Sequence, residues 1–222
     1  MSDVSIRQYN TRQAITQQTT TVRYNAERAQ ELRTEMVRKS IHMLVGLVPF
    51  VASIISPYAT MILLGIAAMV YTAAERSRLL GHRIAVISRI TAMSARRRDQ
   101  GSFVMGPVTL ALGAMASLYL YPEPAATIAI FALAFGDGLA SLVGKFIGRY
   151  RIPFTGGKTI EGSLACFLGV FASSYTVTRD ASQSTVIATV ATLVELLPSR
   201  DADNMLLPIL TGLTAVSVMQ LG

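Results

Sequence analysis

The 222-residue sequence has little charge and almost no cysteine. Charged residues make up 15% of it, whereas a typical soluble domain has about 25%. The single cysteine, Cys166, cannot form an internal disulfide or a zinc cluster, and its apolar neighbours indicate a buried hydrophobic side chain. Disordered chains, fibrous repeats and disulfide-rich secreted scaffolds are therefore excluded.

Several common motifs are also absent. The first 39 residues contain no apolar signal-peptide core, so we expect the N-terminal segment to be retained. The sequence has no internal repeat, no Ser/His/Asp catalytic order, no His-rich zinc pattern, and no haem or nicotinamide-binding fingerprint. These absences argue against hydrolases of the triad type, zinc enzymes and the common redox enzymes.

Apolar sequence is abundant, at 51% of the residues, and it falls in long blocks. Each block is near the length of about 20 residues that crosses a bilayer core, although the sixth is short. Because lipid-exposed backbone must satisfy its own hydrogen bonds, the blocks predict helices. We expect an all-α, polytopic membrane helix bundle of about seven transmembrane helices, over residues 40–56, 58–74, 103–121, 125–146, 159–177, 184–197 and 204–221.

The charges are distributed unevenly. Residues 1–39 carry seven basic and four acidic side chains, residues 75–101 carry seven and two, and residues 102–222 carry six and seven. Basic loops stay on the cytoplasmic side of a membrane. With an odd number of spans, this rule predicts a cytoplasmic N-terminus and an outside C-terminus, with the basic segment 145–158 also inside.

Two charged stretches, 22–37 and 79–93, place apolar residues at helical spacing. Such amphipathic helices lie on anionic membrane lipids. The arginine run 96–98 could also attract nucleic acid, but we expect no nucleic-acid partner because the run is tied between two spans. Residues 1–20, rich in Gln and Thr, are expected to form a flexible tail.

Asp137 lies within an apolar stretch, far from any predicted loop. A charge at the middle of a membrane helix costs about 2.5–3.5 kcal/mol, so a functional role is the first hypothesis. A helix–helix hydrogen bond or a protonated carboxyl is the alternative. Small residues recur every four positions beside it and predict close helix packing, whereas a neighbouring stripe is polar. The small stripe is Gly136, Ala140, Gly144 and Gly148, and the polar stripe is Asp137, Ser141 and Lys145.

The segment after this helix contains the run Gly156-Gly157-Lys158-Thr159. It is not a P-loop, because Ile152 stands where that motif needs glycine. Its physics is nevertheless similar, since the glycines let the backbone curl and Thr159 can cap the following helix, whose N-terminus attracts anions. We therefore expect a phosphate-binding loop. Glu161, in the first turn of that helix, also fits simple compensation of the helix dipole.

Further polar residues lie near the same predicted membrane depth, close to the cytoplasmic side. Acids with Asn suit Mg²⁺, while Lys, Arg and helix N-termini suit phosphate oxygens. Phosphoryl transfer needs mainly positioning and charge neutralisation, so these groups predict that chemistry with a lipid acceptor. The set is His42, Glu75, Arg78, Asp99, Glu195, Asp203 and Asn204.

These residues resemble the signature of the polyprenol kinase family, which includes dolichol kinase, phytol kinase and the CTP-dependent diacylglycerol kinases. The resemblance spans about residues 38–210, and Asp99 departs from it because Glu is expected there. The chain lacks the additional spans of the dolichol kinases. The matching positions are Arg38-Lys39, His42, Gly46, Glu75, Arg78, Arg98-Asp99, Gly101, Phe103, Gly106, Gly136-Asp137, Ala140, Gly144, Gly148-Arg149, Gly157-Lys158-Thr159, Glu161-Gly162-Ser163, Glu195, Asp203-Asn204 and Pro208.

The resemblance implies transfer of the γ-phosphate of CTP, or of another nucleoside triphosphate, to the hydroxyl of a lipid alcohol such as diacylglycerol, a polyprenol or phytol. Its implied roles are as follows: Asp137 for Mg²⁺ or for orienting the acceptor hydroxyl; Glu161, Asp203 and Asn204 for Mg²⁺; Lys158, Arg149, Lys145 and Thr159 for phosphates; Gly144, Gly148, Gly156 and Gly157 for close backbone approach; His42 or Glu195 as general base. Glu75, Arg78, Arg98 and Asp99 are supporting positions.

Two other functions remain open at this stage: a phosphatidate cytidylyltransferase that makes CDP-lipid, and a transporter or membrane scaffold without enzymatic activity. We divide the chain into a cytoplasmic tail and surface helix over 1–37 and a membrane-embedded catalytic domain over 38–222, with 75–101 as a basic surface segment. The membrane would be the plasma membrane of a bacterium or archaeon, or the endoplasmic reticulum of a eukaryote. The site would face the cytoplasm, and the sequence specifies no oligomeric state.

Overall fold

The computed structural model describes residues 3–82, 91, 93, 95, 99, 101–198 and 202–220, and within these the side chains of 3–16 and 19 are left aside. The described chain is helical throughout, apart from turns and one isolated bridge between Arg151 and Thr159. The elements are α1 (Asp3–Met43), the 3-10 turn η1 (Leu44–Leu47), α2 (Val48–Ile55), α3 (Pro57–Leu79), α5 (Gly106–Leu120), α6 (Ala125–Phe131), the π-helical segment η3 (Ala132–Asp137), α7 (Gly138–Phe146), α8 (Ile160–Thr178), α9 (Ala181–Glu195) and α10 (Asp203–Gln220).

Most of these helices coincide with the apolar blocks of the sequence, so the all-α prediction is confirmed for the described residues. The first block, 40–56, is instead divided among the end of α1, η1 and α2. Within the described ranges, four helical stretches are long and apolar enough to cross a membrane. They are Thr20–Ile55, Pro57–Leu79, Ala125–Phe146 and Ile160–Thr178, and α5 is a shorter apolar helix. The structure therefore has the character of a membrane helix bundle.

Local sequence explains where the helices begin. The hydroxyl of Ser56 accepts a hydrogen bond from the backbone N–H of Ala59, which caps α3, and Pro57 occupies the first turn. Thr159 caps α8 and Asp180 caps α9 in the same way. Each cap satisfies an N–H group that the helix itself leaves unpaired.

The bundle core combines small side chains with branched aliphatic ones. Helix α8 packs against α7 and α9, and α10 packs against α9, α5 and α6. Fully buried alanines and Cys166 fill these contacts, as the sequence predicts for the cysteine. Small residues let helices approach closely, which is how helices associate in lipid.

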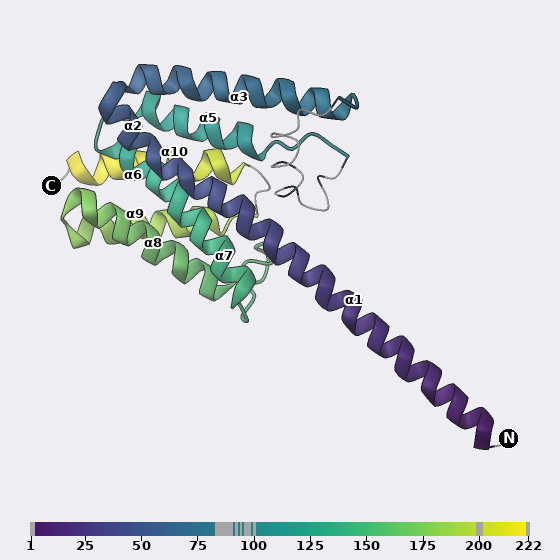
Figure 1. Ribbon diagram of the computed structural model, residues 1–222. Coiled ribbons are helices and arrows are strands. Elements are labelled where there is room, and N and C mark those ends of the chain that lie inside the picture. Colours follow the sequence, from purple (N-terminus) through teal and green to yellow (C-terminus); the bar gives the residue numbers. More distant parts are fainter. Residues whose placement is uncertain are drawn as a thin grey trace.

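Helix α1 extends far beyond the bundle (Figure 1). The sequence predicts a flexible tail over 1–20 and a separate surface helix over 22–37, but the structure has one helix from Asp3 to Met43. Most of the predicted surface helix 79–93 lies outside the described residues.

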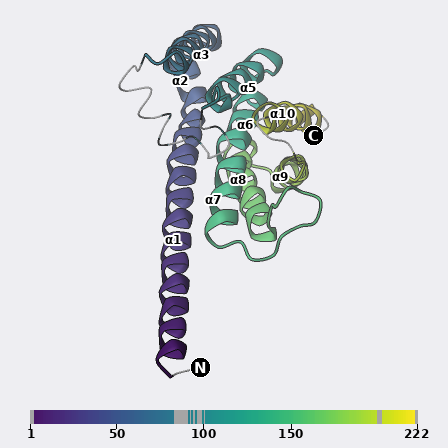
Figure 2. The ribbon, with the colours of Figure 1, turned by 90° about the vertical axis from the view of Figure 1, so that its right-hand side faces the viewer.

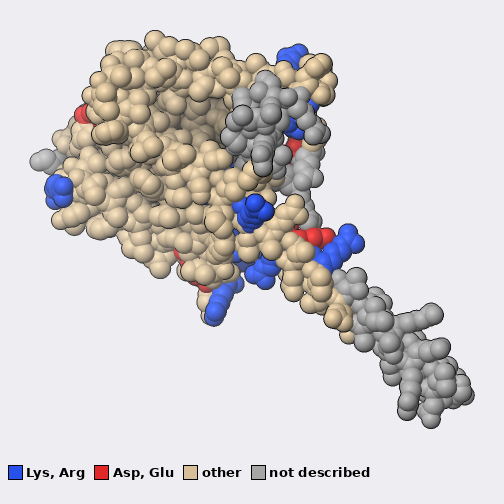
Figure 3. All heavy atoms as spheres, viewed as in Figure 1, with Lys and Arg blue, Asp and Glu red and all other residues tan. Residues whose placement is uncertain are grey.

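The charged side chains gather at the end of the bundle from which α1 projects, while the remaining surface in this view is largely uncharged (Figure 3). This end carries the last turn of α3, the end of α7 and the beginning of α8 (Figure 1). The opposite end carries the α2–α3 and α8–α9 turns and the C-terminus. The structure thus collects the polar residues of distant segments at one end.

Candidate active site

A cavity of about 810 Å³ opens at the charged end of the bundle. This volume is in the range of small-molecule sites, about 300–1,000 Å³. Its walls come from α1, η3, α7, the α7–α8 loop (residues 147–159), α8, the end of α9 and the start of α10. The lining combines carboxylates (Glu27, Glu31, Glu35, Asp137, Glu195, Asp203) with cations (Arg28, Lys145, Arg151, Lys158) and glycines (Gly144, Gly148, Gly156, Gly157, Gly162).

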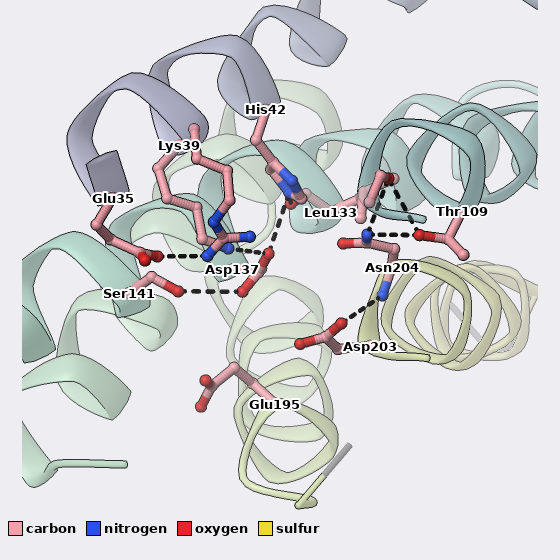
Figure 4. A network of polar contacts seen from close by, with 12 residues as sticks. Glu35, Lys39, His42, Thr109, Leu133, Asp137, Ser141, Glu195, Asp203 and Asn204 are labelled. Carbon is pink, nitrogen blue, oxygen red and sulfur yellow. Dashed lines mark hydrogen bonds and ion pairs between the residues drawn. The ribbon is translucent and has the colours of Figure 1, made fainter. Parts of the chain in front are cut away.

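Asp137, at the end of η3, is buried and faces this cavity. Its carboxylate forms an ion pair with Lys39 and lies 3.2 Å from Nε2 of His42, both on α1 (Figure 4). The hydroxyl of Ser141 donates a weaker hydrogen bond to it, at 3.4 Å. The carboxylate is therefore paired with cationic and polar groups inside the bundle.

The predicted polar stripe continues from Asp137 toward the bundle end. Lys145, two turns from Asp137, donates to the carboxylate of Glu35 on α1 at 2.7 Å. Arg38 contacts the other oxygen of Glu35. The side chains of Asp137, Ser141 and Lys145 all line the cavity, so the stripe forms one of its walls together with α1.

The predicted phosphate-binding loop forms another wall. Gly156 and Gly157 have φ angles of +73° and +97°, which glycine adopts without steric cost. Lys158 follows, and its Nζ lies 3.0 Å from Oε1 of Glu195 at the end of α9. The hydroxyl of Thr159 accepts from the backbone N–H of Gly162 at 3.1 Å, so the N-terminus of α8 also meets the cavity.

The stripe of small residues permits this arrangement. A Cβ atom at Gly148 would lie 2.2 Å from the carbonyl oxygen of Gly144 and 2.6 Å from Oγ1 of Thr159. One at Gly136 would lie 2.9 Å from Val170 of α8. The close approach of α7 and α8 that the spacing predicts is confirmed, and it brings the Thr159 cap against α7.

Glu195 and Asp203 present further carboxylates to the cavity (Figure 4). One oxygen of Glu195, Oε2, is buried without a hydrogen-bond partner. Asp203, just before the seventh apolar block, accepts a hydrogen bond from the backbone N–H of Asn204 at 3.0 Å. Burial raises the pKa of the Asp203 carboxyl to about 6, and the nearby Asp137 charge adds to this effect. A bound cation would offset the free-energy cost that burial and the Asp137 charge impose on the Asp203 carboxylate.

Within the part of the chain that the structure describes, no three His, Cys, Asp or Glu side chains are grouped closely enough to hold a metal ion by themselves. The carboxylates of Asp203 and Asp137 still fit Mg²⁺, because this ion uses one or two carboxylates and completes its shell with water and phosphate oxygens. Such a site would need a phosphorylated ligand beside the protein.

Some predicted site residues lie elsewhere. Glu161 does not line the cavity, and its carboxylate accepts from the backbone N–H of Arg149 at 2.9 Å and of Tyr150 at 3.3 Å. Arg149 also lies outside the cavity wall. These contacts fix the start of the α7–α8 loop. His42 is buried, and its Nε2 lies 2.8 Å from the carbonyl oxygen of Leu133, which can only accept.

The flanking positions also have structural contacts. Glu75 and Arg78 are paired at 2.7 Å, and Glu75 accepts from the backbone N–H of Val104 at 3.1 Å, which holds the start of the α5 segment against α3. Asn204 donates to Thr109 at 2.9 Å and joins α10 to α5. Asp99 is not among the cavity-lining residues, and Arg98 lies outside the described residues.

Comparisons with known proteins find two distantly similar sequences. A rice protein (Oryza sativa subsp. japonica) named "Probable phytol kinase 1, chloroplastic" is 25% identical over 153 residues, which is 61% of this chain and 49% of that protein. A second rice protein, "Probable phytol kinase 2, chloroplastic", is 26% identical over 145 residues, covering 62% of this chain and 46% of that protein.

The chain is a distant relative of these phytol kinases. This relationship confirms the resemblance to the polyprenol kinase family that the motifs predict. The chain spans about half the length of the curated relatives it matches. No protein-family model matches the sequence, and no solved structure matches it.

In this relative of the named phytol kinases, the structure places further residues in or beside the cavity wall. Arg151 lines the cavity, whereas the predicted Arg149 does not. Glu35 and Lys39 of α1 pair with Lys145 and Asp137. Two signals in the sequence point to this part of α1: Arg38-Lys39 and His42 match the family signature, and residues 35, 39 and 42 share one helix face.

Proposed function

We propose that the protein is an integral membrane lipid kinase that transfers the γ-phosphate of CTP, or of another nucleoside triphosphate, to the hydroxyl of a lipid alcohol. The relationship to proteins named as phytol kinases supports the reaction class and favours a prenyl alcohol such as phytol over diacylglycerol. The single observation that carries the proposal is the cavity, in which a glycine-rich cationic loop faces a set of carboxylates within an apolar bundle.

The donor triphosphate is assigned to the loop side of this cavity. Lys158 and Arg151 supply positive charge there, and Gly156 and Gly157 leave the backbone open to phosphate oxygens. The N-terminus of α8 adds its N–H groups. Together these groups bind the triphosphate and stabilise the charge that develops as the terminal phosphoryl group leaves.

Mg²⁺ is the proposed cofactor, with Asp203 and Asp137, which face the same cavity, as its protein ligands. When bound, the ion neutralises charge on the phosphates. The chain's own contribution is to keep carboxylates in a buried site, where Lys39 forms an ion pair with Asp137 and Nε2 of His42 lies 3.2 Å from its carboxylate. We no longer assign Glu161 or Asn204 to the metal, since their contacts are structural.

Glu195 is the proposed general base. Its Oε2 atom is buried without a partner in the cavity wall, where it can accept the proton of an acceptor hydroxyl. His42 is less suited, because its Nε2 atom contacts a carbonyl oxygen and it is not among the cavity-lining residues. Lys158 contacts the same carboxylate and so links the donor and acceptor sides of the site.

The charged end of the bundle is assigned to the cytoplasm, with about seven helices crossing the membrane, the N-terminus inside and the C-terminus outside. The gathering of Lys and Arg at the cavity end supports this orientation (Figure 3). The nucleotide would enter from the cytosol and the lipid alcohol from the bilayer.

The test is an assay of the purified protein in lipid nanodiscs with Mg²⁺, phytol, and CTP or ATP labelled in either the α- or the γ-phosphate. The proposal predicts γ-label in the lipid phase and release of the nucleoside diphosphate. Incorporation of α-label with pyrophosphate release from phosphatidate would instead identify a cytidylyltransferase. If neither label enters a lipid while the nucleotide fails to bind, the protein is not an enzyme of this class.

A further inference from the structure

One side of the α7–α8 loop lines the cavity, and its other side is exposed on the outer surface of the protein. Arg151, Thr155 and the glycines line the cavity, whereas Phe154 is 99% exposed. Phe154 also has a φ of +64°, which is unusual for a bulky side chain. The loop thus projects a large apolar ring outward, directly behind the residues that line the cavity.

Other apolar side chains extend this exposed surface. Tyr150 is exposed, and its carbonyl oxygen accepts from the backbone N–H of Ile160 at 2.9 Å, so the base of the loop lies beside the start of α8. Ile160, Leu164 and Leu168 then follow at four-residue spacing, and each is more than half exposed. They form one apolar stripe along the helix.

Helix α8 is one of the stretches that can cross a membrane. Its exposed apolar stripe is therefore a lipid-facing surface, and the hydrogen bond between Ile160 and Tyr150 places the base of the loop beside its first residue. Arg149 is exposed beside it. Aromatic rings and arginines together are typical of the membrane–water interface, where rings enter the acyl boundary and guanidinium groups meet lipid phosphates.

We propose that the α7–α8 loop lies in the headgroup layer of an anionic membrane, with Phe154 inserted among the acyl chains. The same loop closes one side of the cavity, and it curves around the end of α8 (Figure 2). The loop is then the entry point at which a lipid passes from the bilayer into the cavity. The insertion of Phe154 is argued from the exposed side chains and does not depend on the proposed function. The role of the loop in lipid entry rests on the proposed lipid kinase function.

The sequence contains no tryptophan, so one introduced tryptophan is the sole indole fluorophore. The experiment compares Phe154→Trp with two reference variants in nanodiscs of phosphatidylcholine and phosphatidylglycerol, with and without brominated acyl chains. Leu168→Trp reports the lipid-facing stripe of α8. Gln18→Trp reports an exposed position on the projecting part of α1.

Insertion predicts that Phe154→Trp emits at shorter wavelength than Gln18→Trp, is quenched by bromines placed near the headgroups, and is protected from aqueous iodide. Emission and iodide quenching equal to those of Gln18→Trp would overturn the proposal. If Leu168→Trp also has the emission and iodide quenching of Gln18→Trp, α8 does not face lipid either. A blue shift that appears only when two copies share a nanodisc assigns the surface to a second copy and also overturns the proposal.

Activity separates the entry role from the catalytic role. Phe154→Asp should raise the KM for phytol in the bilayer by about 10-fold, the effect of no longer burying one phenyl ring. Its KM for CTP and its kcat on a short-chain alcohol in detergent should stay unchanged. If Phe154→Asp and the unmodified protein have equal KM values for bilayer phytol, the entry role is overturned. If Phe154→Asp loses turnover on both phytol and the short-chain alcohol, Phe154 acts in the fold or in the chemistry, which also overturns the entry role.

Discussion

Lys39 and Asp137 form an ion pair between α1 and the junction of η3 with α7, although 98 residues separate them in the sequence. The exposed fractions of the two side chains are 2% and 6%. Removing one member of a buried pair leaves the other charge without compensation, at a cost of about 3–5 kcal/mol. The pair therefore fixes α1 as a wall of the cavity.

The first prediction concerns this pair. Asp137→Asn should lower the free energy of unfolding in mixed micelles by about 3–5 kcal/mol, because Lys39 is left buried and unpaired. The double change Asp137→Asn with Lys39→Met should recover most of that stability, since both charges are gone. Phosphoryl transfer should stay abolished in both variants. A double variant with full turnover would remove the Asp137 carboxylate from the chemistry.

The second prediction compares two arginines of the α7–α8 loop. Arg151→Ala should raise the KM for CTP by about 10-fold or more, the effect of losing one charge-assisted hydrogen bond to phosphate. Arg149→Ala is the matched control, because its side chain does not line the cavity and its backbone contact to Glu161 remains. Steady-state kinetics in nanodiscs measure both. Equal effects, or a larger effect at Arg149, would contradict the cavity assignment.

The third prediction separates Asp203 from Glu161. Asp203→Asn should raise the Mg²⁺ concentration for half-maximal activity by about 10-fold, since one charged ligand is lost. Glu161→Gln should leave that concentration unchanged, because the carboxylate holds backbone N–H groups of the loop. Its effect should instead be faster limited proteolysis between residues 149 and 158. A shifted Mg²⁺ requirement in Glu161→Gln would restore Glu161 as a metal ligand.

The fourth prediction concerns the packing of α7 against Thr159. Gly148→Ala should destabilise the protein by about 1–3 kcal/mol, because its Cβ would overlap the Gly144 carbonyl and the Thr159 side chain. Gly106→Ala is the control, since nothing lies within 4 Å of a Cβ there and its φ is not positive. Thermal unfolding in detergent measures the difference. Equal melting temperatures would show that α7 and Thr159 are not in close contact.

The sequence predicts the helices well, because a bilayer imposes a length and an apolar composition on each span. The fourth block, 125–146, matches α6, η3 and α7 from end to end. It also places Asp137 correctly as a buried polar group. The Gln- and Thr-rich start is different, since such a composition carries little helical signal and the structure continues α1 through it.

The partners of the site residues could not be predicted in this way. Glu35 meets Lys145 across 110 residues, and no local pattern encodes that contact. Which of Arg149 and Arg151 lines the cavity depends on the path of the loop, which is held at Arg149 by a hydrogen bond from its backbone N–H to the Glu161 carboxylate. The Glu35–Lys145 contact and the position of the two arginines depend on tertiary packing, which cannot be predicted from the spacing of residue types along the chain.

The most direct test of the account is a structure of the protein in nanodiscs with Mg²⁺ and a non-hydrolysable CTP analogue. In that structure the triphosphate should lie against Lys158, Arg151 and the glycine-rich loop, and the ion should lie beside Asp203. A nucleotide bound outside this cavity, or an empty cavity at a saturating concentration, would contradict it.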